Sequence, residues 1–237
     1  MGMGWYRKTF KANAGWKGKR ILIDFEGIML SGEVWLNGKK IGGTGYGYLG
    51  FESDMAGVIK YDADNVIAVR ASTGESEDSR WYTGGGLFRD VHVVVKDQIS
   101  IARHGVFITT PSVSERNAEV AIQVEVDGIK NGTHELEIQA KIFSPDGKQV
   151  AETKTPAPKK SKLAAVEFPL PKVNLSNPQL WSCENPNLYS AEVALVLNGK
   201  VIDQLTEKFG IRTIEFSKEF GLKLNGKKVF LKGVANH

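Results

Sequence analysis

The stretch RILIDFEGIMLSGEVWLNGKKIG, residues 20–42, decides the fold class of this chain. Its apolar residues Ile21, Ile23 and Phe25 recur at every second position, which is the period of a β-strand with one buried face. Further along, Asn37-Gly38 separates two short runs of strand-forming residues. Such a dipeptide supplies the two positive-φ residues of a tight hairpin turn. The stretch therefore predicts paired antiparallel strands.

The same signals recur along the rest of the chain. Residues 65–71 and 91–96 are short β-branched runs, and two further Asn-Gly steps stand at 198–199 and 225–226. We find no apolar stripe with a period of 3.6 residues that lasts longer than two helical turns. The sequence predicts an all-β protein.

A change of composition at residues 97–103 indicates a domain boundary. The part before it is rich in glycine and aromatic residues, whereas longer and more regular strands are expected after it. These expected strands are 105–110, 119–126, 136–143, 164–170 and 188–197. Their spacing over about 110 residues is typical of an immunoglobulin-like sandwich. Because proline lacks a ladder donor, we expect the segment TPAPK, residues 155–159, in an edge loop.

The C-terminal residues 216–237 are expected to form a hairpin followed by one more strand, KKVFLKGVA, at 227–235. A domain does not normally end on an apolar strand followed by Asn-His. We therefore expect the chain to be truncated.

Composition limits the function classes. The net charge of the 237 residues is +4, but Lys and Arg are spread evenly, which disfavours nucleic-acid binding. No apolar run reaches the roughly 18 residues of a membrane-spanning helix, and the N-terminus lacks a secretory signal, so a periplasmic and a cytoplasmic location both stay open. The single cysteine, Cys183, rules out an intrachain disulfide. The four scattered histidines predict neither a metal site nor a cofactor.

Two loops are candidate binding elements. In TGYGYLGFESD, residues 44–54, glycines alternate with aromatic residues whose rings could contact a sugar, although a structural crossover with buried tyrosines is the alternative. The second loop, 75–91, combines three acids, an arginine, a tryptophan and a glycine run between two expected strands. Long loops of this kind are often functional, and we interpret this one as a binding element.

Taken in order, several motifs resemble family 2 glycoside hydrolases. The segments GWYRKTF, EVWLNGKKIG, YGYLGFESDM, NVIAVRAS and SRWYTGGGLFRDVHVVV are similar to the family's sugar-binding domain. LWSCENPNLYSAEV and FGIRTIEF resemble the end of its immunoglobulin-like domain, and FGLKLNGKKVFLKGVANH resembles the start of its catalytic barrel. The resemblance implies a galactose-binding-like jelly roll at 1–98, an immunoglobulin-like sandwich at 99–213, and the start of a TIM barrel at 214–237.

The resemblance also implies a chemistry. Members of the family hydrolyse β-linked glycosides with retention, using two glutamates whose carboxyl groups lie about 5–5.5 Å apart at the C-terminal ends of barrel strands. Those glutamates would lie beyond residue 237, so we expect this chain alone to be inactive and its parent to be a β-galactosidase, with a glucuronide and a mannoside left open as alternative substrates. The expected partners are the carbohydrate substrate and the missing barrel, with homo-oligomers left open.

The resemblance places three substrate-binding residues in this sequence: Asp78 and Arg80 in the loop that would face the barrel mouth, and His237 at the end of the chain. The alternative interpretation is a stand-alone carbohydrate-binding or surface-adhesion module. The tail FLKGVANH, residues 230–237, distinguishes the two, because a binding module has no use for it.

Overall fold

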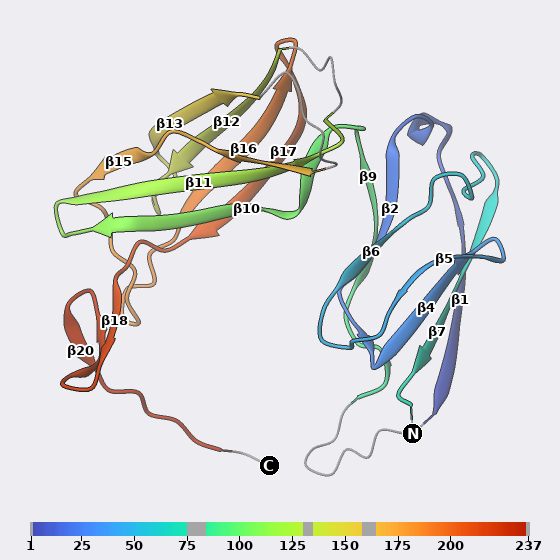
Figure 1. The fold of residues 1–237 in the computed structure, drawn as a ribbon, viewed down its shortest axis with the longest axis horizontal. Coiled ribbons are helices and arrows are strands. Elements are labelled where there is room, and N and C mark those ends of the chain that lie inside the picture. Colours follow the sequence, from blue (N-terminus) through green and yellow to red (C-terminus); the bar gives the residue numbers. More distant parts are fainter. Residues whose placement is uncertain (1, 75–83, 130–134, 158–164, 236–237) are drawn as a thin grey trace. The chain divides into compact units, whose positions relative to one another are not determined.

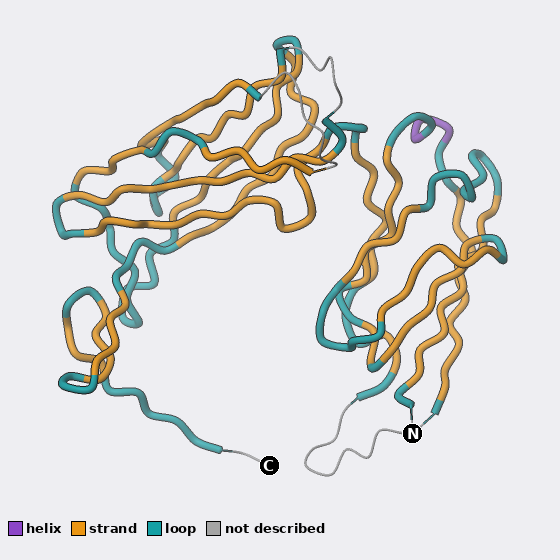
Figure 2. Tube along the Cα trace, viewed as in Figure 1, coloured by secondary structure: helices purple, strands orange, loops and turns teal. Residues whose placement is uncertain are grey.

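A computed structural model describes residues 2–74, 84–129, 135–157 and 165–235. The chain divides into two compact units, one running to Gln98 and the other starting at Ile99 (Figure 1). Within the described ranges the only helical segment is a short 3-10 turn, η1 (Ala14–Trp16), and nearly all remaining regular structure is strand (Figure 2). The prediction of an all-β chain is confirmed.

The front unit is a sandwich of two antiparallel sheets. One sheet has the order β1-β7-β4-β5, and the other has the order β6-β2-β9. A two-stranded ribbon, β3 with β8, lies beside them. The strands are β1 (Met3–Lys11), β2 (Arg20–Phe25), β3 (Ile28–Met29), β4 (Ser31–Leu36), β5 (Lys39–Thr44), β6 (Phe51–Asp54), β7 (Asp64–Ser72), β8 (Gly86–Leu87) and β9 (Val91–Lys96).

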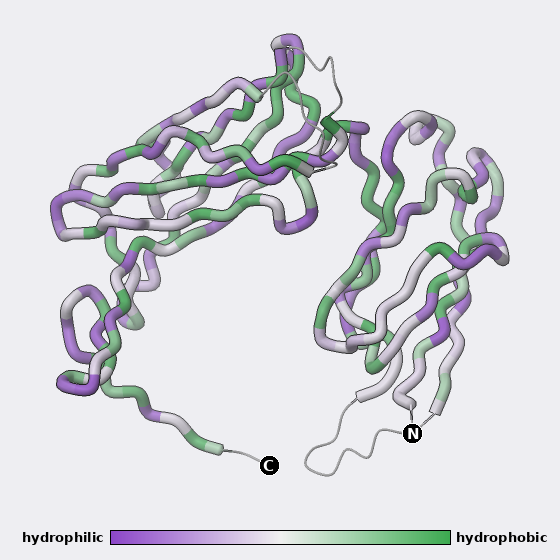
Figure 3. The backbone as a smooth tube through the Cα atoms, in the orientation of Figure 1, coloured by the Kyte–Doolittle hydropathy of each residue, from purple (hydrophilic) through white to green (hydrophobic). Residues whose placement is uncertain are grey.

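The core of the front unit follows the predicted period of two. Ile21 and Phe25 of β2 are buried, and so are Val34 and Leu36 of β4 on the opposing sheet. Hydrophobic and hydrophilic stretches alternate along much of the front unit (Figure 3), and burial alternates strictly in β4, whereas in β2 Leu22 is buried together with both of its neighbours. Each such side chain contributes about 2 kcal/mol when it is removed from water. The sandwich is therefore held mainly by the residues that the sequence pattern selects.

The second unit is an immunoglobulin-like sandwich. Its first sheet has the order β10-β11-β14, with β15 also paired to β11, and its second sheet has the order β13-β12-β16-β17. The five strands predicted from the sequence correspond to β10, β11, β12, β14 and β16. The strands are β10 (Ser100–Val113), β11 (Asn117–Asp127), β12 (Leu136–Phe143), β13 (Gln149–Pro156), β14 (Ala165–Pro169), β15 (Val173–Ser176), β16 (Tyr189–Leu197) and β17 (Lys200–Phe209).

Proline marks an edge in this sandwich, as expected. Pro156 is the last residue of β13, and β13 is the outer strand of its sheet. The ladder partner of Pro156 is Glu137, at the start of β12. The expected loop is in part a strand, but its edge position is confirmed.

A small antiparallel sheet closes the second unit: β18 (Ile214–Ser217), β19 (Gly221–Leu224) and β20 (Lys227–Val229). The predicted hairpin is present, but the predicted last strand is too long, since strand pairing stops at Val229. Beyond it Phe230 is 81% exposed, and Leu231 and Val234 are exposed as well. Alternating apolar residues do not by themselves form a strand when no other described residues cover their apolar side chains.

All three Asn-Gly steps form the predicted turns. Asn37, Asn198 and Asn225 have φ values of 50°, 50° and 51°, and the glycine after each also has a positive φ. The turns connect β4 to β5, β16 to β17, and β19 to β20. Asparagine and glycine are the residues that adopt this left-handed conformation at least cost.

Asn225 also attaches the small sheet to the sandwich. Its Oδ1 accepts a hydrogen bond from the Thr213 amide at 3.0 Å, and its Nδ2 donates to the Trp181 carbonyl at 3.0 Å. Arg212, which precedes Thr213 in the chain, also contacts Trp181: its guanidinium lies 4.7 Å from the centre of the indole ring. The side chain of one turn residue thus joins β19–β20 to the loop before β16.

We predict that Asn225→Gly loosens this attachment while it preserves the turn. The substitution keeps a residue that tolerates positive φ but removes both side-chain hydrogen bonds. Hydrogen exchange should show faster exchange at residues 221–229. Asn198→Gly is the matched control, because its turn is of the same kind and its side chain has no hydrogen bond to a described residue. Equal protection in the two variants would contradict the proposed anchor.

Asn65 is a buried polar residue that organises the front unit. Its side chain is fully buried and forms four hydrogen bonds, accepting from the Lys60 amide and from Asn37 Nδ2, and donating to the carbonyls of Lys60 and Ala63. It connects the start of β7 to the β4–β5 turn through Asn37. A buried amide is tolerated here because all of its bonding capacity is used.

We predict that Asn65→Ala lowers the free energy of unfolding by about 3 kcal/mol, because the partly buried groups that it now binds would lose their partners. Urea denaturation followed by tryptophan fluorescence measures the loss. Asn174→Ala, at an exposed position on β15, should change the same quantity by less than about 0.5 kcal/mol. A similar small effect at Asn65 would show that its network does not stabilise the fold.

Candidate functional site

The three residues that the sequence singled out for substrate binding, Asp78, Arg80 and His237, lie outside the described residues. Asp78 and Arg80 belong to the segment 75–83, which follows Gly74 and precedes Gly84. Their roles stay predictions.

A hollow of about 320 Å³ lies where this segment leaves and rejoins the front unit. Backbone and small side chains form most of it. Thr73 contributes its hydroxyl, which accepts a hydrogen bond from the Gly2 amide at 3.1 Å and lies 3.2 Å from the Gly2 carbonyl oxygen. The lining residues are Gly2, Gly4, Tyr6, Ala71, Thr73, Gly85 and Gly86.

Glycine is required at one point of this hollow. Gly86 has a φ of 82°, and a Cβ added there would lie 2.0 Å from the Tyr6 hydroxyl oxygen. Gly86 also pairs with Met29 in the β3–β8 ribbon. The absence of a side chain lets the Tyr6 ring lie against the backbone of β8.

Tyr6 also lines an adjoining apolar cleft of about 260 Å³ between the two sheets of the front unit. Ile23, Phe25, Val69 and Leu87 are among its other walls. No carboxylate lines either hollow in the part of the chain that the structure describes.

The glycine-rich stretch 44–54 exposes its two tyrosines, while its Phe51 packs against the core and stacks on Phe25. Tyr46 and Tyr48 are both exposed, and their ring centres lie 5.6 Å apart with the planes tilted by 59°. The alternative of buried tyrosines is therefore wrong. Gly47 between them is buried against Met29. The nearby carboxylate of Asp54 caps its own turn by accepting a hydrogen bond from the Ala56 amide at 2.7 Å.

Other candidate chemistry is sparse in the described residues. Cys183 is exposed, so it does not pack in a core. Within the described ranges, no cluster of three or more His, Cys, Asp and Glu side chains could hold a metal ion. None of the helical segments described has the length and apolarity needed to cross a bilayer.

Sequence reasoning did not single out Tyr6, Thr73 or Gly86. The glycine run 84–86 was a possible signal for Gly86, because such runs often occur where another group lies close to the backbone. It does not reveal that this group is the Tyr6 side chain. Tyr6 reaches Gly86 only because β1 pairs with β7 and the chain returns through β8. That contact follows from topology rather than from any local motif.

Comparison with known proteins defines the class of this chain. Residues 1–97 match the model "Glycosyl hydrolases family 2, sugar binding domain", and residues 99–212 match the model "Glycosyl hydrolases family 2". The architecture and these matches are those of the front domains of a glycosidase. The chain belongs to glycosyl hydrolase family 2.

Several relatives are similar over the whole chain. A putative β-glucuronidase of Formosa agariphila is 36% identical over 100% of this chain and 22% of its own length. The β-galactosidase BoGH2A of Bacteroides ovatus is 31% identical over 100% of this chain and 28% of its own length. A crystal structure of a family 2 member from Bacteroides cellulosilyticus has a TM-score of 0.90 and 35% identity, covering 98% of this chain and 32% of that one. The chain spans between 22% and 35% of the length of four curated relatives that it matches.

We predict that Gly86→Ala displaces the Tyr6 ring and lowers the free energy of unfolding by about 1–3 kcal/mol, through the clash and the positive φ. In a Tyr6→Phe background the cost should be smaller, because the clashing hydroxyl is gone. Gly84→Ala is the control, since a Cβ there meets nothing within 4 Å. Thermal denaturation of the four variants measures the difference; equal costs in both backgrounds would exclude the Tyr6 contact.

Proposed function

We propose that this chain is the non-catalytic front part of a retaining glycoside hydrolase that acts on β-linked glycosides. The observation that carries the proposal is the succession of two family 2 sandwich domains along the described chain. The relatives named above are glycosidases several times longer than this chain. In this proposal, residues 1–98 form one wall of the substrate site and residues 99–213 support the catalytic barrel. Residues 214–237 are the start of that barrel.

Within that class, we infer a β-galactoside as the substrate. Relatives named β-galactosidase from Bacteroides ovatus and Thermoanaerobacter pseudethanolicus support this choice. Relatives named β-glucuronidase make a glucuronide the competing outcome. Asp78, Arg80 and His237 are proposed to contact the sugar once the barrel completes the site.

We predict that the 237-residue chain does not hydrolyse aryl β-galactosides or aryl β-glucuronides above background, because no retaining carboxylate pair is proposed to lie within it. The full-length parent should hydrolyse the galactoside, and Asp78→Asn in that parent should raise KM or lower kcat/KM about tenfold or more through loss of a hydrogen bond to substrate. Asp64→Asn, on β7, is the matched control.

Two outcomes would contradict the proposed role of the chain, and a third would contradict only the proposed substrate. Turnover by the purified 237-residue chain would place catalytic groups within it. Inactivity of the parent on every β-glycoside would remove the hydrolase assignment. A parent that cleaves the glucuronide and not the galactoside would replace the substrate and keep the reaction class.

A further inference from the structure

A short connection joins the front unit to the second unit. β9 ends at Lys96 and β10 begins at Ser100, so only Asp97, Gln98 and Ile99 lie between the two strands. The division between the two compact units falls between Gln98 and Ile99. Domains of one chain are expected to move relative to each other unless a large apolar interface holds them together. The contacts of the connecting residues indicate where such a movement occurs.

The front unit holds the connection as far as Gln98. The backbone pairing of β2 with β9 ends one residue before Lys19 and Asp97 are reached. Side chains continue the same register beyond that point. Lys19 Nζ forms an ion pair with Asp97 Oδ1 at 2.7 Å, and one step further Gln98 Nε2 donates to the Gly18 carbonyl at 2.9 Å. We call these two contacts the front clamp.

The front clamp is attached to a turn that is itself hydrogen-bonded. The Lys19 amide donates to the Trp16 carbonyl at 3.0 Å, and Trp16 packs against the core of the front unit. The side chain of Asn13 caps the η1 turn by accepting a hydrogen bond from the Gly15 amide at 2.8 Å. The clamp therefore ties the connection to a fixed part of the front unit.

The second unit holds the connection from Ile99 onward. Ile99 is partly buried against the core of this unit, and Ser100 and Ile101 are fully buried. The Ile101 amide donates to Asp203 Oδ2 at 2.8 Å. Because β10 and β17 belong to different sheets of the sandwich, this carboxylate joins the two sheets where the chain enters the unit. We call the burial of Ile99 and the bond to Asp203 the second clamp.

A bulge gives the second clamp its importance. Ile101 and Val106 of β10 pair with residues of β11 that are only two positions apart, so residues 102–105 bulge out of the ladder. The start of β10 is thereby separated from the long, regular part of the strand. Asp203 supports this short first part from the opposite sheet.

We propose that the peptide link between Gln98 and Ile99 is a single-point hinge between the two units. Movement occurs by rotation about ψ of Gln98 and φ of Ile99, and both clamps persist because neither rotation moves a side chain against its own unit. Hinges of this kind absorb a change in a few backbone dihedral angles at the ends of elements. Asp97 then always moves with the front unit, and Ser100 always moves with the second.

Nuclear spin relaxation of the backbone amides in the ¹⁵N-labelled 237-residue chain tests the proposal. We expect a separate rotational diffusion tensor for each unit, with Asp97 fitting the front unit and Ser100 fitting the second. The order parameters of these two amides should be near 0.85, the approximate value of a rigid backbone.

The double variant Lys19→Met with Gln98→Ala removes the front clamp. We expect the order parameter of the Asp97 amide to fall below about 0.6, because the flexible part of the chain then extends back to the end of β9. The Ser100 amide should stay ordered, since the second clamp is unchanged.

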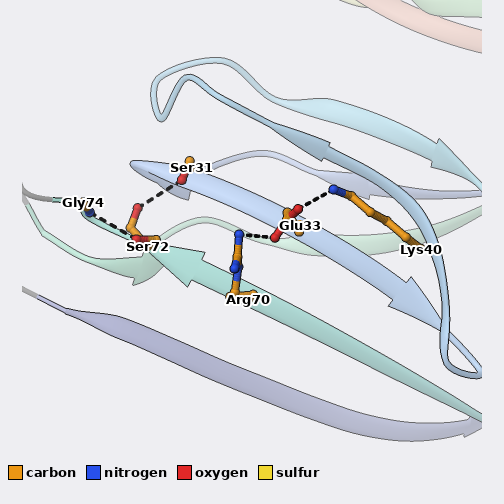
Figure 4. A network of polar contacts seen from close by, with 6 residues as sticks. All are labelled: Ser31, Glu33, Lys40, Arg70, Ser72 and Gly74. Atoms are coloured by element: carbon orange, nitrogen blue, oxygen red, sulfur yellow. Dashed lines mark hydrogen bonds and ion pairs between the residues drawn. The ribbon is translucent and has the colours of Figure 1, made fainter.

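The matched control is Lys40→Met with Gln149→Ala. Lys40 forms an ion pair with Glu33 between β5 and β4 (Figure 4), and Gln149 donates a hydrogen bond within β13. This variant also loses one ion pair and one glutamine hydrogen bond, but neither of them involves the connection. The Asp97 amide should therefore keep its order.

Asp203→Ala tests the second clamp. Hydrogen exchange of the Ile101 amide should accelerate about tenfold or more, because the amide loses a charged acceptor. Glu207→Ala removes an exposed acid from the same strand and should leave that exchange rate unchanged. The front-clamp variant decides the question independently if Asp203→Ala does not fold.

The proposal is overturned by one common diffusion tensor for both units, or by low order at Asp97 or Ser100 in the unchanged chain. It is also overturned if the Asp97 amide stays ordered in the front-clamp variant. None of these measurements involves a substrate. A failed hinge therefore leaves the proposed hydrolase function intact, and an inactive parent leaves the hinge intact.

Discussion

The burial of every second side chain between two sheets is the constraint on which this protein depends. In the second unit it places Val124 and Val126 of β11 against Ile138 and Leu195 of the opposite sheet. A shift of one residue along any strand would exchange the buried and exposed sets, so the register is strongly determined. The same constraint leaves the alternate residues outside. Function can vary on those outer rows and in the loops without disturbing the cores.

The two units use this constraint differently. The second unit has long, regular strands, and a large set of aliphatic residues fills its core. The front unit has shorter strands and relies on close backbone approaches, where Gly43 lies against the carbonyl of Gly32 and Gly47 lies against Met29. It also relies on the buried amide of Asn65. A unit built in this way leaves more of its surface to loops and exposed aromatic rings.

Much of the fold could be predicted from the sequence because its signals are local. The strand signal that starts at Arg20 and the Asn-Gly turns depend on neighbouring residues; the structure confirms the turns and a strand over Arg20–Phe25, in which Leu22 is buried as well as Ile21, Ile23 and Phe25. The last strand was predicted too long because alternation at 227–234 does not reveal that no second face covers Phe230. Site geometry was harder to predict. Tyr6 meets Gly86, and Trp5 meets Trp35, only through the pairing of β1 with β7, which no spacing along the chain encodes.

The Asn-Gly turns that allow the hairpins are also sites at which asparagine is prone to deamidation. The amide nitrogen of a glycine can attack the side-chain carbonyl carbon of the preceding asparagine, expelling ammonia and forming a succinimide that opens to aspartate or isoaspartate. Hydrogen bonds hold both ends of the Asn37 and Asn225 amide groups in place. The Asn198 side chain has no such bond to any described residue. We therefore expect deamidation of stored protein to begin at Asn198, in the turn between β16 and β17. It adds a negative charge there, and the isoaspartate product also lengthens the backbone by one methylene. Peptide mapping would locate the change.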